Sequence, residues 1–327
     1  MDKKKLYEFS KKYINSSNIK MVILFIPLLI LFLKESMNGR YCLSTFLDTS
    51  ILVSFFLLFV CEVVAGRLSS WIMAKCEDAA KLTEDYENLN QKYCREKLIQ
   101  YKGIVFPEIC IAFRKMDESP FVFNFQFDTK KPIYQLPNQI AEHSMELMEA
   151  HAHSTVYNNM NVRLNHLIQD ETMIEIVYSR TTYFDSLITN RSMDYPLCGK
   201  SIREIYEPGP FLSTLSESKL SNHLGFNGFV ELANEKIIFI HRNTRVSIGK
   251  NMLATSIGAS YKTVYGLDEH RCMTKETLDH AIRMEIKDEL KIDVPESYRL
   301  DQSIFAFYRD IVEGGKPQFL FYIKLSN

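Results

Sequence analysis

The chain has 327 residues, of which 46% are apolar and 24% charged, so it can form an ordinary globular core and is not a disordered protein. Its formal net charge of −1 argues against a general binder of nucleic-acid polymers, which would need an excess of basic residues. Seven cysteines without a C-x-x-C pair encode neither a disulfide framework nor a zinc site, and they fit a soluble part in a reducing, cytosolic compartment.

Two apolar runs near the N-terminus predict a pair of membrane-spanning helices. Residues 21–33 carry no charge, and a second run covers residues 49–66. Because a span needs about 20 residues, each helix must extend into its polar flanks, to about 20–37 and 46–66. The alternatives are a signal peptide and a buried soluble hairpin; charged residues directly after the first run, without a small-residue cleavage pattern, disfavour the signal peptide.

The basic residues around this hairpin predict its orientation. Six lysines precede the first span and Arg67 and Lys75 follow the second, whereas the connecting loop carries only Lys34 and Arg40. Since basic flanks stay in the cytoplasm, the segment 1–19 and the C-terminal region should both be cytoplasmic, in a protein that crosses the bilayer twice.

Residues 67–101 read as a helix with the apolar spacing of a coiled coil. The spacing alternates between three and four along Ala79, Leu82, Tyr86, Leu89 and Tyr93. We expect a coiled-coil stalk that joins copies of the chain into a homo-oligomer. The alternative is a single amphipathic helix that lies on its own domain.

Prolines interrupt the helical pattern after residue 102 and predict a connector over residues 102–160. Alternating phenylalanines at 121–127 predict a strand within it, and residues 140–153 predict a helix. The helix carries three histidines, but no carboxylate or cysteine accompanies them at metal-ligand spacing, which disfavours a metal site.

From residue 161 to 327 the pattern predicts one mixed α/β sandwich. Strands are expected at 173–178, 228–232, 237–241, 304–308 and 319–323. One long helix, capped by Thr274, should run from about Lys275 to Lys291.

Three carboxylates share one face of this helix. Glu285, Asp288 and Glu289 are at positions i, i+3 and i+4, so they repel one another unless a cation lies between them. Mg²⁺ would serve, because it prefers carboxylate oxygens, water and phosphate. The alternative is a solvated acidic face, relieved by Lys287 and Lys291.

The segment 281–292 resembles the core of a Nudix box, G-x5-E-x7-R-E-U-x-E-E-x-G-U, with Glu276 at the position of the upstream glutamate. The resemblance implies that Glu285, Asp288 and Glu289 bind the metal and that Glu289 supports the general base, with Glu276 as a further catalytic group.

At three positions of the box the chain departs from the family. His270 and Lys291 stand where the family has glycine, and Met284 stands where it has the arginine that orients the glutamates. These departures weigh against hydrolysis.

Beyond the box, residues 160–327 are similar to the SMODS-associated Nudix domain, notably at 185–191 and 222–227. Together with two transmembrane helices, the chain resembles the membrane effectors of bacterial anti-phage CBASS systems. The resemblance implies an inner-membrane protein whose Nudix-like domain binds a cyclic di- or oligonucleotide, the product of a partner CD-NTase, and whose helices then disrupt the lipid bilayer.

Four cations near the expected sheet are candidates for phosphate contacts: Arg242, Arg245, Lys250 and Lys262. The competing hypothesis is a membrane-tethered, Mg²⁺-dependent Nudix hydrolase of nucleoside diphosphate derivatives. A third is a scaffold with an inert Nudix-like fold.

Overall fold

The computed structural model describes residues 81–151, 157–243 and 251–325, together with three isolated residues before position 68. By its contacts the chain divides into two compact units, 1–78 and 79–327, and the following description concerns the second. The expected membrane spans lie outside the described residues, apart from those three isolated positions. None of the helices in the described part is long and apolar enough to cross a bilayer.

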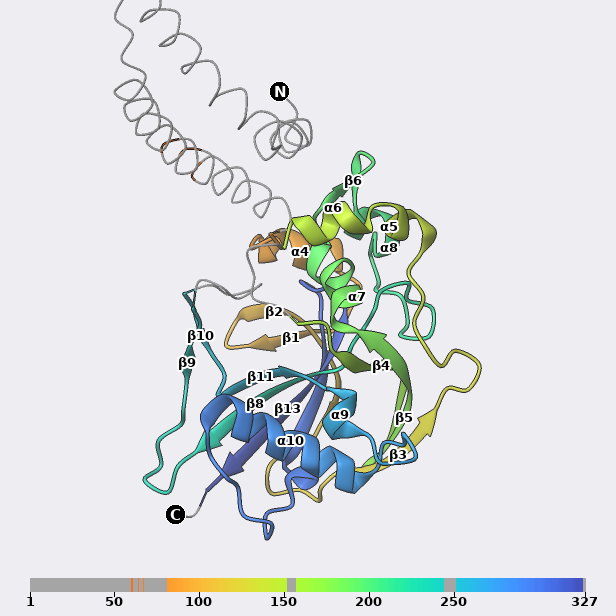
Figure 1. Ribbon diagram of the computed structural model, residues 1–327. Coiled ribbons are helices and arrows are strands. Elements are labelled where there is room, and N and C mark those ends of the chain that lie inside the picture. The colour runs from red at the N-terminus through yellow and green to blue at the C-terminus, as the bar shows by residue number, and fades with distance from the viewer. Residues whose placement is uncertain are drawn as a thin grey trace, which may run out of the picture. The chain divides into compact units, whose positions relative to one another are not determined.

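A six-stranded sheet forms the centre of the unit, in the order β1-β2-β12-β13-β8-β11 (Figure 1). All its neighbouring strands are antiparallel except β13 and β8, which are parallel. Apolar side chains alternate along β13, where Phe319, Phe321 and Ile323 are buried on one face. The strands are β1 (Leu98–Tyr101), β2 (Ile104–Phe113), β8 (Gly225–Glu231), β11 (Ile257–Ser260), β12 (Ile304–Asp310) and β13 (Lys316–Lys324).

A second sheet of three strands, β3-β5-β4, packs against the first. The centroid of the Phe123 ring in β3 lies 6.0 Å from that of Phe307 in β12 and 6.4 Å from that of Phe319 in β13. The contact shows how the phenylalanine alternation of the sequence forms the core between the two sheets. The strands are β3 (Val122–Phe127), β4 (Met160–Asp170) and β5 (Met173–Thr182).

The long helix α10 (Lys275–Leu290) covers one end of this core. It begins where expected, because the Thr274 hydroxyl accepts a hydrogen bond from the Thr277 backbone N–H. Its buried stripe is Leu278, Ala281, Ile282 and Ile286, residues spaced by three or four positions. The expected helix and its cap are confirmed.

Short helices and hairpins complete the unit. The helix expected at 140–153 is two short helices, α5 and α6, which break at His143. The elements are α5 (Asn138–Glu142), α6 (Ser144–Glu149), α7 (Tyr183–Leu187), η2 (Asn190–Ser192), β6 (Pro196–Leu197), β7 (Lys200–Ser201), α8 (Ile202–Tyr206), β9 (Ile240–His241), β10 (Leu253–Ala254), α9 (Thr263–Gly266) and η3 (Leu300–Ser303).

The expected stalk is wrong for its described part, residues 81–101. Only α4 (Tyr86–Lys92) is helical, and the chain then enters strand β1. Leu89 and Tyr93 are buried against the same domain, and the Tyr93 hydroxyl donates to the backbone oxygen of Glu207, 2.6 Å away. The apolar spacing reflects a short amphipathic helix on its own domain, which was the alternative interpretation.

Residues 102–151 and 157–160 are likewise part of the fold and not a connector. Strand β2 pairs with β12, and β3 pairs with β5, so this segment contributes to both sheets. The prolines of this segment suggested a connector, but they lie at the edges of strands or in loops, apart from Pro107 within β2, and so they do not prevent the segment from forming strands. The expected mixed α/β class is confirmed for the described residues.

Candidate functional site

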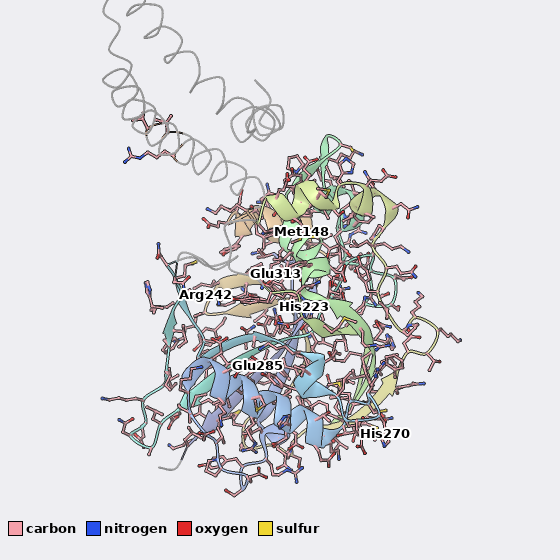
Figure 2. All side chains as sticks on the ribbon, in the orientation of Figure 1. Met148, His223, Arg242, His270, Glu285 and Glu313 are labelled. Carbon is pink, nitrogen blue, oxygen red and sulfur yellow. The ribbon has the colours of Figure 1, made fainter. Side chains whose placement is uncertain are left out.

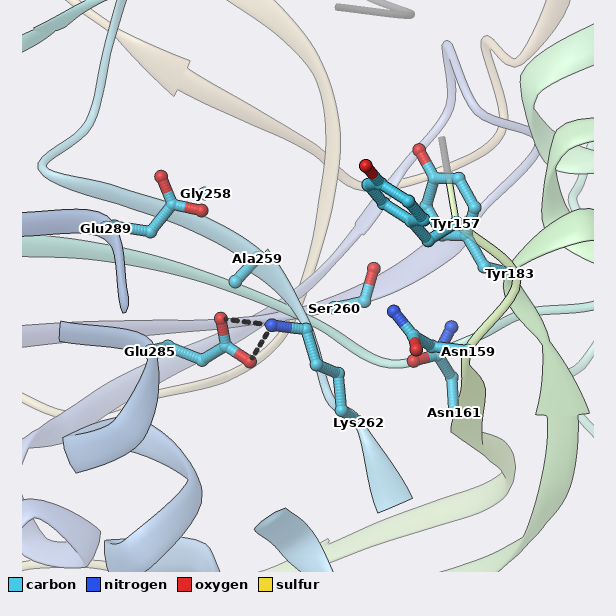
Figure 3. A pocket seen from close by; sticks show the side chains of 10 residues that line it. All are labelled: Tyr157, Asn159, Asn161, Tyr183, Gly258, Ala259, Ser260, Lys262, Glu285 and Glu289. Atoms are coloured by element: carbon cyan, nitrogen blue, oxygen red, sulfur yellow. Dashed lines mark hydrogen bonds and ion pairs between the residues drawn. The ribbon is translucent and has the colours of Figure 1, made fainter. Parts of the chain in front are cut away.

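A cleft of about 330 Å³ opens where α10, strand β11 and the first residues of β4 meet (Figure 3). Its walls combine aromatic, amide, hydroxyl and charged side chains. They are Tyr157, Asn159, Asn161, Tyr183, Gly258, Ala259, Ser260, Lys262, Glu285 and Glu289.

Strand pairing explains why these side chains converge. Asn161 and Lys262 are partners in an antiparallel bridge, so their side chains point to the same face. Residues two positions away share that face, which adds Asn159 and Ser260. The Tyr183 backbone N–H donates a hydrogen bond of 2.9 Å to the backbone oxygen of Asn159, which brings the tyrosine to the same rim.

The floor beside α10 is an ion pair between Glu285 and Lys262. Glu285 is 1% exposed, and the Lys262 Nζ lies 2.9 Å from its Oε1 and 3.0 Å from its Oε2 (Figure 3). Burial raises the pKa of Glu285, and Lys262 opposes that rise. For Lys262, burial lowers the pKa, but the Glu285 carboxylate outweighs it and the net shift is upward. The ion pair thus favours the charged form of both groups, and burial disfavours it.

The other two carboxylates of the acidic face have different surroundings. Asp288 accepts a hydrogen bond of 3.1 Å from the Tyr265 hydroxyl, and its Oδ2 lies 3.8 Å from the Lys262 Nζ. Glu289 lines the cleft. The repulsion expected among the three carboxylates is thus relieved by a lysine of the neighbouring segment, a partner that the helix sequence did not reveal.

This arrangement does not fit a preformed Mg²⁺ site. Within residues 81–151, 157–243 and 251–325, no group of three or more His, Cys, Asp or Glu is placed to hold a metal ion. A metal at Glu285, Asp288 and Glu289 would have to displace the Lys262 ammonium. Metal binding by these residues remains a prediction.

Of the four expected phosphate contacts, Lys262 lines the cleft, and Arg242 lies beside one of its lining residues, Gly258. The Arg242 Nη1 is 3.6 Å from the place that a Cβ on Gly258 would take, which is an ordinary van der Waals distance. Burial and then Arg191 lower the pKa of Arg242, whereas Glu289 raises it, which places that carboxylate within its electrostatic reach. Arg245 and Lys250 lie outside the described residues.

Glu276 is not part of the cleft. It lies in the first turn of α10, nine residues before Glu285, which is roughly 13 Å along the helix axis. Its pKa is lowered by hydrogen bonds at the helix N-terminus, which is a local capping effect. His270 also lies at that far end of the helix (Figure 2).

Behind the cleft, a histidine orients the serine of the wall. The His223 Nε2 lies 3.0 Å from the Ser260 Oγ, and His223 is fully buried. Burial, followed by the positive charges of Lys316 and Arg191, holds its pKa well below the usual range.

The two cations behind His223 converge on one buried carboxylate. The Glu313 carboxylate lies 2.6 Å from the Arg191 Nε and 3.3 Å from the Lys316 Nζ. Glu313 and His223 are both buried, and Figure 2 labels them near the middle of the domain, with Arg242 to their left. The network fixes the inner wall of the cleft.

Of the ten residues that line the cleft, only Lys262, Glu285 and Glu289 were expected from the sequence. Four of the others, Tyr157, Asn159, Asn161 and Tyr183, precede α10 by about 100 residues, and the β4–β5 pairing and the bridge from Asn161 to Lys262 bring them to the cleft. The available signal was the amide-rich run at 158–161, just before an apolar strand.

Comparison with known proteins assigns this chain to no family. No protein-family model matches the chain, and a search of curated proteins finds no significant match. The cleft and its chemistry are therefore the features that indicate a function.

Proposed function

We propose that the unit 79–327 is a Nudix-like domain that binds a cyclic nucleotide, and that the chain is a membrane-anchored effector of a bacterial anti-phage CBASS system. The cleft carries this proposal. Its volume of about 330 Å³ falls within the range of roughly 300–1,000 Å³ that is usual for small-ligand sites.

The lining matches the parts of a nucleotide. Tyrosine rings stack on bases, and Tyr157 and Tyr183 both line the rim. Lys262 in the lining and Arg242 beside Gly258 supply positive charge for phosphate. A ligand with both aromatic and anionic parts uses all of these groups at once.

The ion pair favours binding over hydrolysis. Lys262 occupies both oxygens of Glu285, which is the carboxylate that a Nudix hydrolase would use for its metal. Lys291, at the box position of a glycine, ends α10 in the left-handed conformation with φ of 60° and donates to the Asp288 backbone oxygen. The box therefore retains its shape as a helix terminus while its metal-binding role is weakened.

One observation favours the competing hydrolase. Glu289, the proposed support for a general base, lines the cleft. We expect Glu289→Gln to leave nucleotide binding intact if the domain is a sensor, and to abolish Mg²⁺-dependent turnover if it is an enzyme. Glu276→Gln is the matched control, because Glu276 lies in the first turn of the same helix, away from the cleft.

The membrane part of the proposal rests on the sequence. Ligand binding would act on the helices expected at 20–37 and 46–66, which associate and breach the bilayer. To move such an equilibrium from 1:99 to 99:1, the ligand must favour the active state by about 5.5 kcal/mol.

The decisive experiment uses the full-length chain in liposomes with an entrapped dye. Cyclic di-AMP, cyclic di-GMP and cyclic GMP–AMP are added in turn, while chromatography follows their consumption. We expect dye release with an unconsumed ligand, and no release from Lys262→Met/Glu285→Gln, which removes the cation without leaving the Glu285 carboxylate buried alone. Consumption of a nucleotide at an enzymatic rate without dye release would replace the sensor by the hydrolase.

A further inference from the structure

Among the described residues that line the cleft, Asn161 is the one buried side chain in which no polar atom has a hydrogen-bond partner. It is fully buried, yet neither its Oδ1 nor its Nδ2 makes a hydrogen bond. Buried amides are normally paired, because an unpaired donor or acceptor loses its hydration without compensation. The side chain lines the cleft (Figure 3).

Strand pairing on both sides of Asn161 fixes the direction in which its side chain points. On one side Asn161 is in register with Thr181 of β5, and on the other it bridges Lys262. The neighbouring Val162 N–H donates to the Tyr261 oxygen at 2.9 Å. Two flanking strands thus hold the carboxamide at the cleft, and exchanging its oxygen and nitrogen would leave both unpaired just the same.

A second asparagine on the same strand shows what a structural amide looks like. Asn165 is 5% exposed and fully engaged: its Oδ1 accepts from Arg163 and from the Ser179 hydroxyl at 2.9 Å, and its Nδ2 donates to Asp128 at 2.8 Å. The contrast assigns structural pairing to Asn165 and leaves Asn161 without such a role.

We propose that Asn161 is the base-reading residue of the cleft and that the base is adenine. This inference rests on the proposed function, since it assumes that the ligand is a nucleotide. A carboxamide pairs with two adjacent groups, one donor and one acceptor, and adenine presents N6–H₂ beside N7. Adenine repeats this pattern on its other edge, with N6–H₂ beside N1, whereas guanine presents two acceptors, N7 and O6, on the first edge and can satisfy the whole amide only through N1–H and O6.

The setting of the amide fits this role. Asn159 flanks it on the same strand face, Lys262 lies opposite as its bridge partner, and Tyr183 reaches the same wall. A base held on the amide therefore has an aromatic neighbour, and its phosphate has a cation within the same cleft.

The test compares Asn161→Leu with Asn165→Leu in the full-length chain in detergent, by thermal unfolding and by equilibrium binding of cyclic di-AMP and cyclic di-GMP. In the absence of nucleotide we expect Asn161→Leu to melt at or above the wild-type temperature, because it removes two unpaired polar atoms, and Asn165→Leu to melt lower. We expect Asn161→Leu to weaken cyclic di-AMP binding about 5- to 150-fold, the range for loss of one bidentate pair.

Each contrary result has its own meaning. If Asn161→Leu melts as low as Asn165→Leu, the amide is structural and the inference fails. It also fails if the wild type binds cyclic di-GMP as tightly as cyclic di-AMP and Asn161→Leu changes neither affinity. If the wild type binds neither nucleotide, the proposed function itself fails, and the assignment of adenine with it.

Discussion

At the scale of single residues, the site is governed by a charge that the acidic helix does not itself contain. The three carboxylates of α10 suggest a bound cation, and the structure supplies the ammonium of Lys262. The buried Glu285 carboxylate and the half-buried Lys262 ammonium both lose hydration, so each depends on the other remaining in place.

Removal of Lys262 tests that dependence. We expect Lys262→Met to lower the free energy of unfolding by about 3–5 kcal/mol at neutral pH, because it leaves Glu285 buried without a partner. Urea denaturation of the full-length chain in detergent, followed by tyrosine fluorescence, measures this loss. The double variant Lys262→Met/Glu285→Gln removes the orphaned charge and should recover much of it. Equal losses in single and double variants would show that the pair is not mutually dependent.

A second prediction at this scale concerns Asp310, at the end of β12. Burial raises its pKa to about 7, with the carboxylates of Glu313 and Glu108 acting in the same direction and Lys316 opposing them. In an unfolded chain the pKa of an aspartate is about 3.9. Between about pH 4 and 7 the folded state thus binds a proton that the unfolded state has released.

The sign of the resulting pH dependence follows from this difference. The contribution of Asp310 to stability is complete below about pH 4 and is lost as the pH rises through about 7. We expect the unfolding free energy of the wild type to fall relative to that of Asp310→Asn over this window. Urea titrations at several pH values measure the difference, and a difference independent of pH would contradict the assignment.

At the scale of elements, α4 shows how an apolar spacing can serve two different structures. Leu89 is 3% exposed and Tyr93 fully buried, and both belong to one buried apolar cluster with Leu212 and Ile311 of their own domain. The same spacing of three and four suits a coiled-coil seam and a helix on a sheet edge. The length of the helix decides between them, because seven residues are too few for a stable seam.

The location of α4 yields a direct prediction. We expect Leu89→Ala to destabilise the domain by about 2–5 kcal/mol, the usual range for a buried leucine truncated to alanine. Tyr86→Ala, at a position of the same helix that is 45% exposed, is the control and should change stability little. Chemical denaturation measures stability, and sedimentation reports oligomeric state. Dissociation of an oligomer by Leu89→Ala without loss of stability would restore the seam interpretation.

At the scale of the whole molecule, the chain joins a folded α/β unit to a segment whose expected role is in the membrane. The apolar runs at 21–33 and 49–66 and their basic flanks predict two spans with both termini in the cytoplasm. This arrangement would put the cleft in the cytoplasm, which the proposed function requires, because the proposed cyclic-nucleotide ligand would be made there.

Fractionation of cells tests that topology. We expect the full-length protein to remain with membranes after carbonate extraction, because two spans hold it by burial in lipid. Protease added to spheroplasts should leave the unit 79–327 intact, whereas after lysis it should be cleaved. Recovery of the full chain in the soluble fraction would contradict the membrane anchor.

The sequence by itself determined features that depend on local periodicity. The strands at 173–178 and 319–323 and the helix capped by Thr274 follow from alternation, helical spacing and a capping hydroxyl, which are properties of neighbouring residues. The acidic face with Glu285 was visible for the same reason. So was the mixed α/β class, since both periods occur in one segment.

The tertiary structure alone decided which residues meet. The bridge between Asn161 and Lys262 joins positions about 100 residues apart, and it places an unpaired amide beside the lysine that neutralises Glu285. Strand β2 likewise reaches β12 across nearly 200 residues. Such pairings depend on the register of distant strands and on burial, and periodicity within a short window carries no information about either.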